Sequence, residues 1–115
     1  MLSRKAKLRE NAAKHMEPGE EIRESVLVRM GAVRQQNHAL IATDRNLYAF
    51  RLSWPGFSKV AEQLARIPLA EARLEVTGNA VVLLDPSSGE ERRRWKRLPF
   101  RNPTGVAEHV NAQAG

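Results

Sequence analysis

Residues 39–50 read ALIATDRNLYAF, two apolar runs on either side of the polar tetrapeptide TDRN at 43–46. Asp and Asn tolerate left-handed backbone and hydrogen-bond to their own main chain, so this tetrapeptide predicts a tight turn. In the second run, Tyr48, Phe50 and Leu52 alternate with other residues and therefore share one face of a strand. The stretch predicts a β-hairpin.

Outside this hairpin, Gly and Pro recur between short apolar runs. That spacing is typical of successive short strands and not of a helical bundle. Gly78-Asn79 is a two-residue hairpin signal, and the PSSG segment at 86–89 marks another turn. We expect seven strands, over residues 22–30, 38–43, 46–52, 62–67, 73–77, 80–84 and 91–98.

The first of these strands has an apolar face with a period of two residues, interrupted at Glu24. The residues predicted to share that face are Ile22, Val26, Val28 and Met30.

A helix is expected at each end of the chain. Residues 3–16 predict a basic helix whose apolar stripe is weak, so it docks on the domain, docks on another copy or frays. Near the other end, Asn102 is a suitable N-cap and Pro103 a suitable first helical residue. Val106 and Val110 lie four residues apart on one face, which predicts a short helix to about residue 113.

The chain has 115 residues and no Cys. Its length suits one domain that buries a core of its own. The lack of Cys excludes disulfides, Cys-ligated zinc, iron–sulfur clusters and thiol nucleophiles. No run approaches about 18 apolar residues, and the first sixteen residues hold no signal-peptide core, so we expect a cytoplasmic protein. Peripheral attachment at the inner face of the membrane stays open.

The net charge of +6 is concentrated at the two ends of the chain. Residues 1–16 carry a net +4, residues 17–90 a net −2, and residues 91–115 a net +4. Such asymmetry attracts nucleic acid, an anionic lipid surface or an acidic protein, or else serves solubility alone.

Seven short strands followed by one C-terminal helix resemble the pleckstrin-homology-like superfold, and within it the bacterial PH-like and GRAM-like domains. The local likeness lies in EPGEEI at 17–22, ALIATDRNLYAF at 39–50 and IPL at 67–69. The resemblance implies a basic N-terminal helix over 1–16 and a mainly β domain over 17–115. That domain would be a seven-stranded antiparallel bent barrel or sandwich, capped by the C-terminal helix with Val106 and Val110 as its plug.

Members of that family mostly bind and do not catalyse, and some bacterial members are regarded as assembly modules, which adds a homo-oligomer to the expected states. Eukaryotic members often hold phosphoinositides through a basic motif in the first hairpin. Here the corresponding loop, 31–37, offers Arg34, with Arg29 and His38 at its edges.

No catalytic motif is present. The three His lie in different predicted elements, and Asp44 and Asp85 each adjoin a turn. The Glu pairs at 20–21 and 90–91 are adjacent, so their side chains point to opposite faces of a strand. We expect no enzyme activity, metal, cofactor or small-molecule substrate, although distant residues could still assemble a site.

The last strand carries a candidate binding surface. Arg92, Arg94 and Lys96 share one of its faces, with cations about 6.6–7 Å apart, a spacing that suits successive anionic groups. The alternative interpretation is an edge strand protected by charge. Trp95 lies on the other face and is expected to pack inward.

Two further features suggest binding. Trp54 and Phe57 share one predicted loop, where they enter a lipid interface or a partner pocket, or fold back over the sheet. The basic N-terminal helix could lie on an anionic membrane. The sequence therefore predicts a binding module for a protein partner, another copy or an anionic membrane surface. The alternative is a small basic nucleic-acid-binding protein. Against it, this sequence offers few aromatic residues on which bases could stack.

Overall fold

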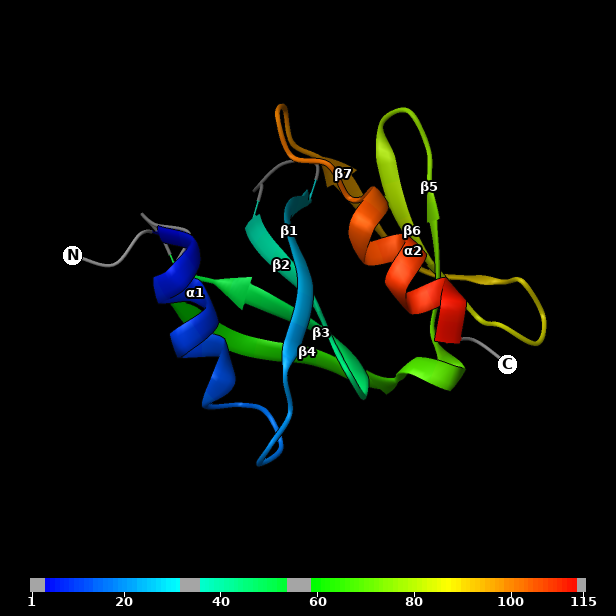
Figure 1. Ribbon diagram of the computed structural model, residues 1–115. Helices are drawn as coiled ribbons and strands as arrows, with labels where there is room; N and C mark the ends of the chain where they lie inside the picture. Colours follow the sequence, from blue (N-terminus) through cyan, green and yellow to red (C-terminus); the bar gives the residue numbers. More distant parts are fainter. Residues whose placement is uncertain (1–3, 32–35, 54–58, 114–115) are drawn as a thin grey trace.

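The seven strands form one antiparallel sheet in the order β4-β3-β2-β1-β7-β6-β5, with a helix at each end of the chain (Figure 1). The computed structural model describes residues 4–31, 36–53 and 59–113. The prediction of a mainly β protein with seven strands and two helices is confirmed. The elements are α1 (Arg4–Ala13), β1 (Ile22–Met30), β2 (Gln36–Thr43), β3 (Asn46–Leu52), β4 (Val60–Pro68), a 3₁₀ turn (Leu69–Glu71), β5 (Arg73–Val76), β6 (Ala80–Leu84), β7 (Glu91–Arg97) and α2 (Thr104–Gln113).

The β2–β3 hairpin forms at the predicted turn. The buried Thr43 hydroxyl oxygen accepts hydrogen bonds from the backbone N–H groups of Arg45 and Asn46, at 3.1 and 2.9 Å. These bonds satisfy donors that the turn removes from the strand ladder, so a short polar tetrapeptide can join two buried strands.

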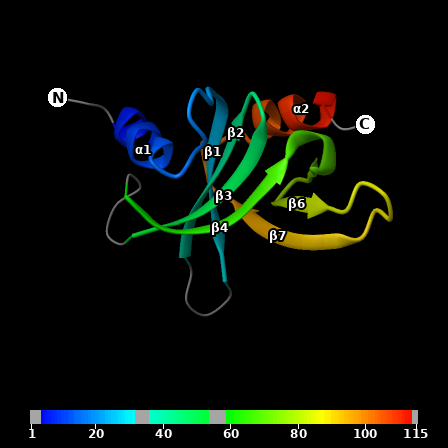
Figure 2. The same ribbon diagram turned by 90° about the horizontal axis from the view of Figure 1, so that it is seen from below.

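Both faces of this hairpin are buried. Leu8 and Ala12 of α1 pack on one face, against Ala39, Ile41 and Tyr48. The opposite face belongs to the main core with α2 and the second half of the sheet, and its members include Leu40, Ala42, Leu47 and Ala49. Burial on both faces explains the almost unbroken apolar run of the sequence. Figure 2 shows α1 and α2 beside different parts of the curled sheet.

The predicted inward face of β1 is wrong at Ile22. Val26, Val28 and Met30 belong to the main core, but Ile22 packs with the α1 cluster on the other face. The pairing with β2 shifts between Ile22 and Glu24, as in a β-bulge. An extra residue in one strand reverses the alternation before it, which accounts for the interruption at Glu24.

α2 closes the main core as expected. The Asn102 carboxamide oxygen accepts the Thr104 N–H at 3.0 Å, the capping bond expected of this residue, although the helix begins at Thr104, one residue later than predicted. Val106 and Val110 are fully buried. Farther along the helix, the Asn111 side chain accepts the Leu74 N–H at 2.9 Å and donates to the Leu74 carbonyl at 2.8 Å. α2 therefore covers backbone groups of β5, an edge strand of the sheet.

In the strand order β7 is not an edge strand, but among the described residues the stretch that carries Arg92 and Arg94 is paired on the β6 side alone, so edge protection by these two cations stays a prediction. It lies between β6 and β1, although it pairs with β1 only through Val28↔Arg97 and Arg29↔Lys96. Trp95 faces inward, as predicted, and its Nε1–H donates to Nδ1 of the buried His38 at 3.0 Å. The chain leaves the sheet after Arg97, and one edge of β1 stays open.

No helix in the described part of the chain combines the length and the apolar character needed to cross a membrane.

Candidate functional site

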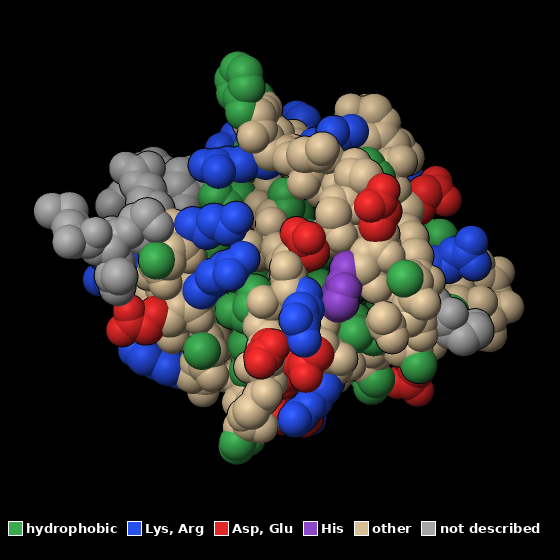
Figure 3. Space-filling model, in the orientation of Figure 1, with side chains coloured by type: hydrophobic (Ala, Val, Ile, Leu, Met, Phe, Trp, Pro, Cys, Tyr) green, Lys and Arg blue, Asp and Glu red, His purple; other side chains and the backbone are tan. Residues whose placement is uncertain are grey.

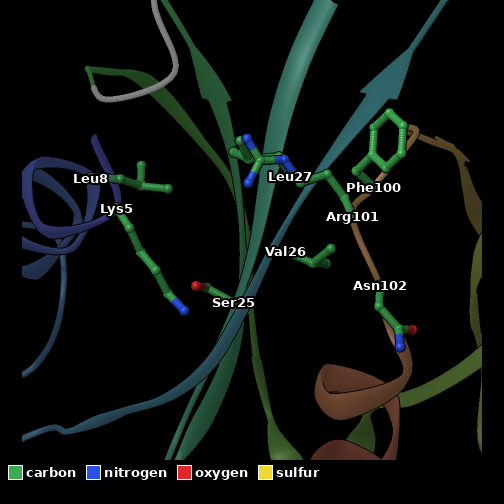
Figure 4. Close-up of a pocket in the computed structure, with 8 residues that line it drawn as sticks. All are labelled: Lys5, Leu8, Ser25, Val26, Leu27, Phe100, Arg101 and Asn102. Atoms are coloured by element: carbon green, nitrogen blue, oxygen red, sulfur yellow. The ribbon is translucent and has the colours of Figure 1, made fainter. Parts of the chain in front are cut away.

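A cleft of about 220 Å³ opens along β1, between α1 and the segment that joins β7 to α2 (Figure 4). Ser25 and Leu27 of its lining lie on one face of β1, whereas Val26 lies on the other. A cavity that touches both faces of three consecutive residues runs along the edge of the strand. The lining residues are Lys5, Leu8, Ser25, Val26, Leu27, Phe100, Arg101 and Asn102.

The edge is open because the chain after β7 cannot continue the ladder. Pro99 and Pro103 lack the N–H that a paired strand donates. The Arg101 N–H is instead directed to the carbonyl oxygen of Leu98, at 3.3 Å, which closes a four-residue turn. Among the described residues, no backbone hydrogen bond joins residues 22–27 to the segment 98–103.

Phe100 occupies the third position of that turn with a φ of +62°. Proline at the second position and positive φ at the third are the signature of a type II turn, which favours Gly at the third position. A bulky L-residue there costs about 1–2 kcal/mol. The Phe100 side chain is also 104% exposed, the one exposed large hydrophobic side chain among the residues described. Phe100 therefore combines backbone strain with full exposure of an apolar side chain at the rim of the cleft.

The charge of the cleft has one sign. Its charged lining residues are Lys5 and Arg101, and no lining residue is acidic. Lys5 extends from α1 toward Ser25, and the Arg101 side chain reaches over β1 toward Leu27 (Figure 4). On the face drawn in Figure 3, Lys and Arg side chains gather between α1 and the segment before α2. An anionic group is therefore favoured beside Lys5 and Arg101, whereas the exposed Glu24 carboxylate lies next to Gly105 at the start of α2.

The predicted cation ladder of β7 is largely paired with acidic neighbours. Arg92 Nη2 lies 2.5 Å from Asp85 Oδ2, and Arg94 Nη2 lies 2.7 Å from Glu91 Oε1. Hydrogen bonds from Ser87 and then Arg92 hold the pKa of Asp85 well below its usual range. Lys96 is exposed, and within the described ranges it has no ion-pair partner.

A second hollow, of about 290 Å³, lies where β7 meets the end of β1. It brings Arg94 and Lys96 of the ladder beside Arg29 of β1. Arg29 Nε also donates to the Asn37 carboxamide oxygen at 3.4 Å. The predicted interaction residues Trp54, Phe57 and Arg34 lie outside the described residues.

The Glu20 carboxylate has a structural role. Glu20 accepts hydrogen bonds from the Thr43 hydroxyl, from Tyr48 OH at 2.7 Å, from Asn46 Nδ2 at 3.2 Å and from the Glu17 N–H at 3.0 Å. Burial acts to raise the pKa of Glu20, but these hydrogen bonds, led by that of Thr43, outweigh it and lower the pKa. Burial and the bond to Glu20 raise the pKa of Tyr48 to about 12. This carboxylate fastens the segment before β1 to the β2–β3 hairpin.

Sequence reasoning missed the main features of the cleft. The sequence does not predict Phe100, Lys5 and Arg101 as site residues. Lys5 and Arg101 come from opposite ends of the chain, and nothing in the sequence places them at one cleft. One signal was present: the segment PFRNP at 99–103 places an aromatic and a cation between two prolines. In the part of the chain that the structure describes, no group of three or more His, Asp or Glu side chains is placed to hold a metal ion.

The chain was compared with known proteins in three ways. No family model matches the sequence, and no curated protein or solved structure matches it.

Proposed function

We propose that this protein is a non-catalytic binding module of the PH-like class, which holds an acidic segment of a partner protein in the cleft along β1. The observation that carries the proposal is Phe100, fully exposed on strained backbone at the rim of a cleft lined by Lys5 and Arg101. An exposed aromatic anchor beside a groove with nearby cations is typical of a protein-binding site.

The PH-like assignment is supported by two features of the fold. Seven antiparallel strands precede a C-terminal helix, and that helix covers the main core with Val106 and Val110. This arrangement suits a scaffold that presents loops and edges to a ligand.

A protein partner fits these observations better than a membrane or a nucleic acid. A membrane-binding surface needs several apolar side chains on one face, whereas Phe100 is the one large exposed hydrophobic residue in the described part. Single-strand binders stack bases on several aromatic residues. Arg92 and Arg94, two of the three β7 cations that would meet phosphates, are held by Asp85 and Glu91.

The test is selection from a random 12-residue peptide library displayed on phage, followed by fluorescence anisotropy with the selected synthetic peptides. We expect acidic residues to be enriched among the selected sequences. A double variant, Lys5→Glu with Arg101→Glu, should lower the affinity at least about tenfold, because two attractive contacts become repulsive.

The matched control is Lys7→Glu with Lys14→Glu. Both side chains are exposed, lie outside the cleft lining, and change the net charge equally. Affinity within about twofold of wild type in this control supports the cleft as the site. The proposal fails if no peptide is selected, or if both double variants weaken binding equally. It also fails if vesicles of phosphatidylcholine and phosphatidylserine, or a 20-nucleotide single strand, bind more tightly than every peptide.

A further inference from the structure

β1 presents an unpaired backbone edge inside the cleft. On one side, Glu24, Ser25, Val26 and Leu27 pair with residues 39–42 of β2. On the other side, pairing begins only at Val28, opposite Arg97. The alternate N–H and C=O groups of residues 24–27 that point away from β2 therefore have no strand partner within the described ranges.

The backbone edge of β5, unlike that of β1, is covered by a side chain of α2. At β5, the Asn111 carboxamide takes both the N–H and the C=O of Leu74, as a neighbouring strand would. No comparable side chain covers residues 24–27 in the described part of the chain, and the cleft lies against three of them. A strand lies about 4.7–4.9 Å from its neighbour, so a chain that enters the cleft at this edge comes within pairing distance.

Resting on the proposed function, we propose that the acidic segment binds as an added β-strand against residues 24–27 of β1. The added strand occupies the place that β7 would fill if it continued past Arg97. Its side chains alternate between two faces. Those on the α1 side meet Leu8, Leu27 and the Lys5 ammonium, which selects an apolar residue and an acidic residue two positions apart.

Strand addition gives affinity through main-chain hydrogen bonds and selectivity through alternate side chains. This mode differs from docking of a helix. A helix bonds its backbone N–H and C=O groups internally, and it needs apolar residues at helical spacing. The cleft is short and its floor is a strand edge, with apolar contacts from Leu8 and Leu27 on one side. An extended segment is therefore the occupant that the backbone of β1 can recognise.

The test uses one peptide selected by the wild-type protein, synthesised as a series with a single N-methylated amide at each position. We expect the affinity to fall about tenfold or more at two positions that lie two residues apart and to change little at the position between them, because only the alternate N–H groups opposite residues 24–27 point to β1. In the wild-type protein, alternate amides among residues 24–27 should exchange with deuterium more slowly once the unmodified peptide is bound.

A scan without a two-residue period, or unchanged exchange at residues 24–27, would overturn strand addition while peptide binding itself stands. Failure to select any peptide would remove the proposed function and this inference together. The two failures are thus distinguishable in the same series of measurements.

Discussion

Replacement of Phe100 by Gly should separate the stability of the fold from its binding. The φ of +62° costs a bulky residue about 1–2 kcal/mol, and Gly adopts it without a steric penalty. Gly also gives the unfolded chain more freedom, which offsets about 0.5–1 kcal/mol of that gain. The side chain is 104% exposed, so the substitution loses no buried apolar surface.

The expected net effect of Phe100→Gly is therefore between zero and about 1.5 kcal/mol of added stability, an increase of up to about 6 °C in Tm. Urea and thermal unfolding, followed by circular dichroism, measure it. The same variant should bind a selected peptide about tenfold more weakly, because the aromatic anchor is gone.

Phe100→Asn is the matched control, since Asn also removes the ring but tolerates positive φ with a side chain present. It should bind as weakly as the Gly variant. Destabilisation of both variants by more than about 1 kcal/mol would mean that Phe100 packs against the fold and would refute the argument. Unchanged affinity in both would remove Phe100 from the binding site.

Three further predictions concern the interior. Thr43→Val removes the acceptor of two backbone N–H groups and should lower the free energy of unfolding by about 1–3 kcal/mol in urea titrations; a loss below about 0.5 kcal/mol would contradict the role of that hydroxyl. Burial lowers the pKa of His38, so just below about pH 6.5 only the unfolded chain protonates this ring. The free energy of unfolding that His38 contributes should therefore be complete above that pH and decline as the pH falls toward the lowered pKa. His38→Gln keeps an acceptor for Trp95 and should flatten that decline between pH 7.5 and 5, and an unchanged slope would be inconsistent with a buried neutral His38. Tyr48 is the one Tyr of the sequence and has a pKa of about 12, so the absorbance at 295 nm should titrate near pH 12. The stability that Tyr48 contributes should be lost as the pH rises from about 10 through 12. Glu20→Gln removes the neighbouring charge and should lower the titration midpoint, whereas an unshifted midpoint would contradict the bond between the two side chains.

Local features of the fold could be predicted from the sequence. The turn at 43–46 depends on side chains that bond to their own backbone, and the N-cap at Asn102 satisfies the N–H of Thr104 two residues later. The burial of Val106 and Val110 follows from their spacing on one helical face.

Features set by pairing between distant segments could not be predicted in the same way. The displacement of Ile22 arises from a shift in register against β2, and one strand does not reveal its partner's register. The interior position of β7 depends on strand order, which alternation along one strand does not encode. The candidate site could not be predicted for the same reason, since Lys5 and Arg101 come to opposite sides of one cleft only in the folded sheet.

The most direct test of the cleft is an NMR map of amide chemical shifts on the ¹⁵N-labelled wild-type protein, titrated with a selected acidic peptide. The account predicts that the largest shifts cluster at Lys5, at residues 24–27 and at residues 100–102. Shifts centred instead on Arg92, Arg94 and Lys96, with residues 24–27 unmoved, would contradict it.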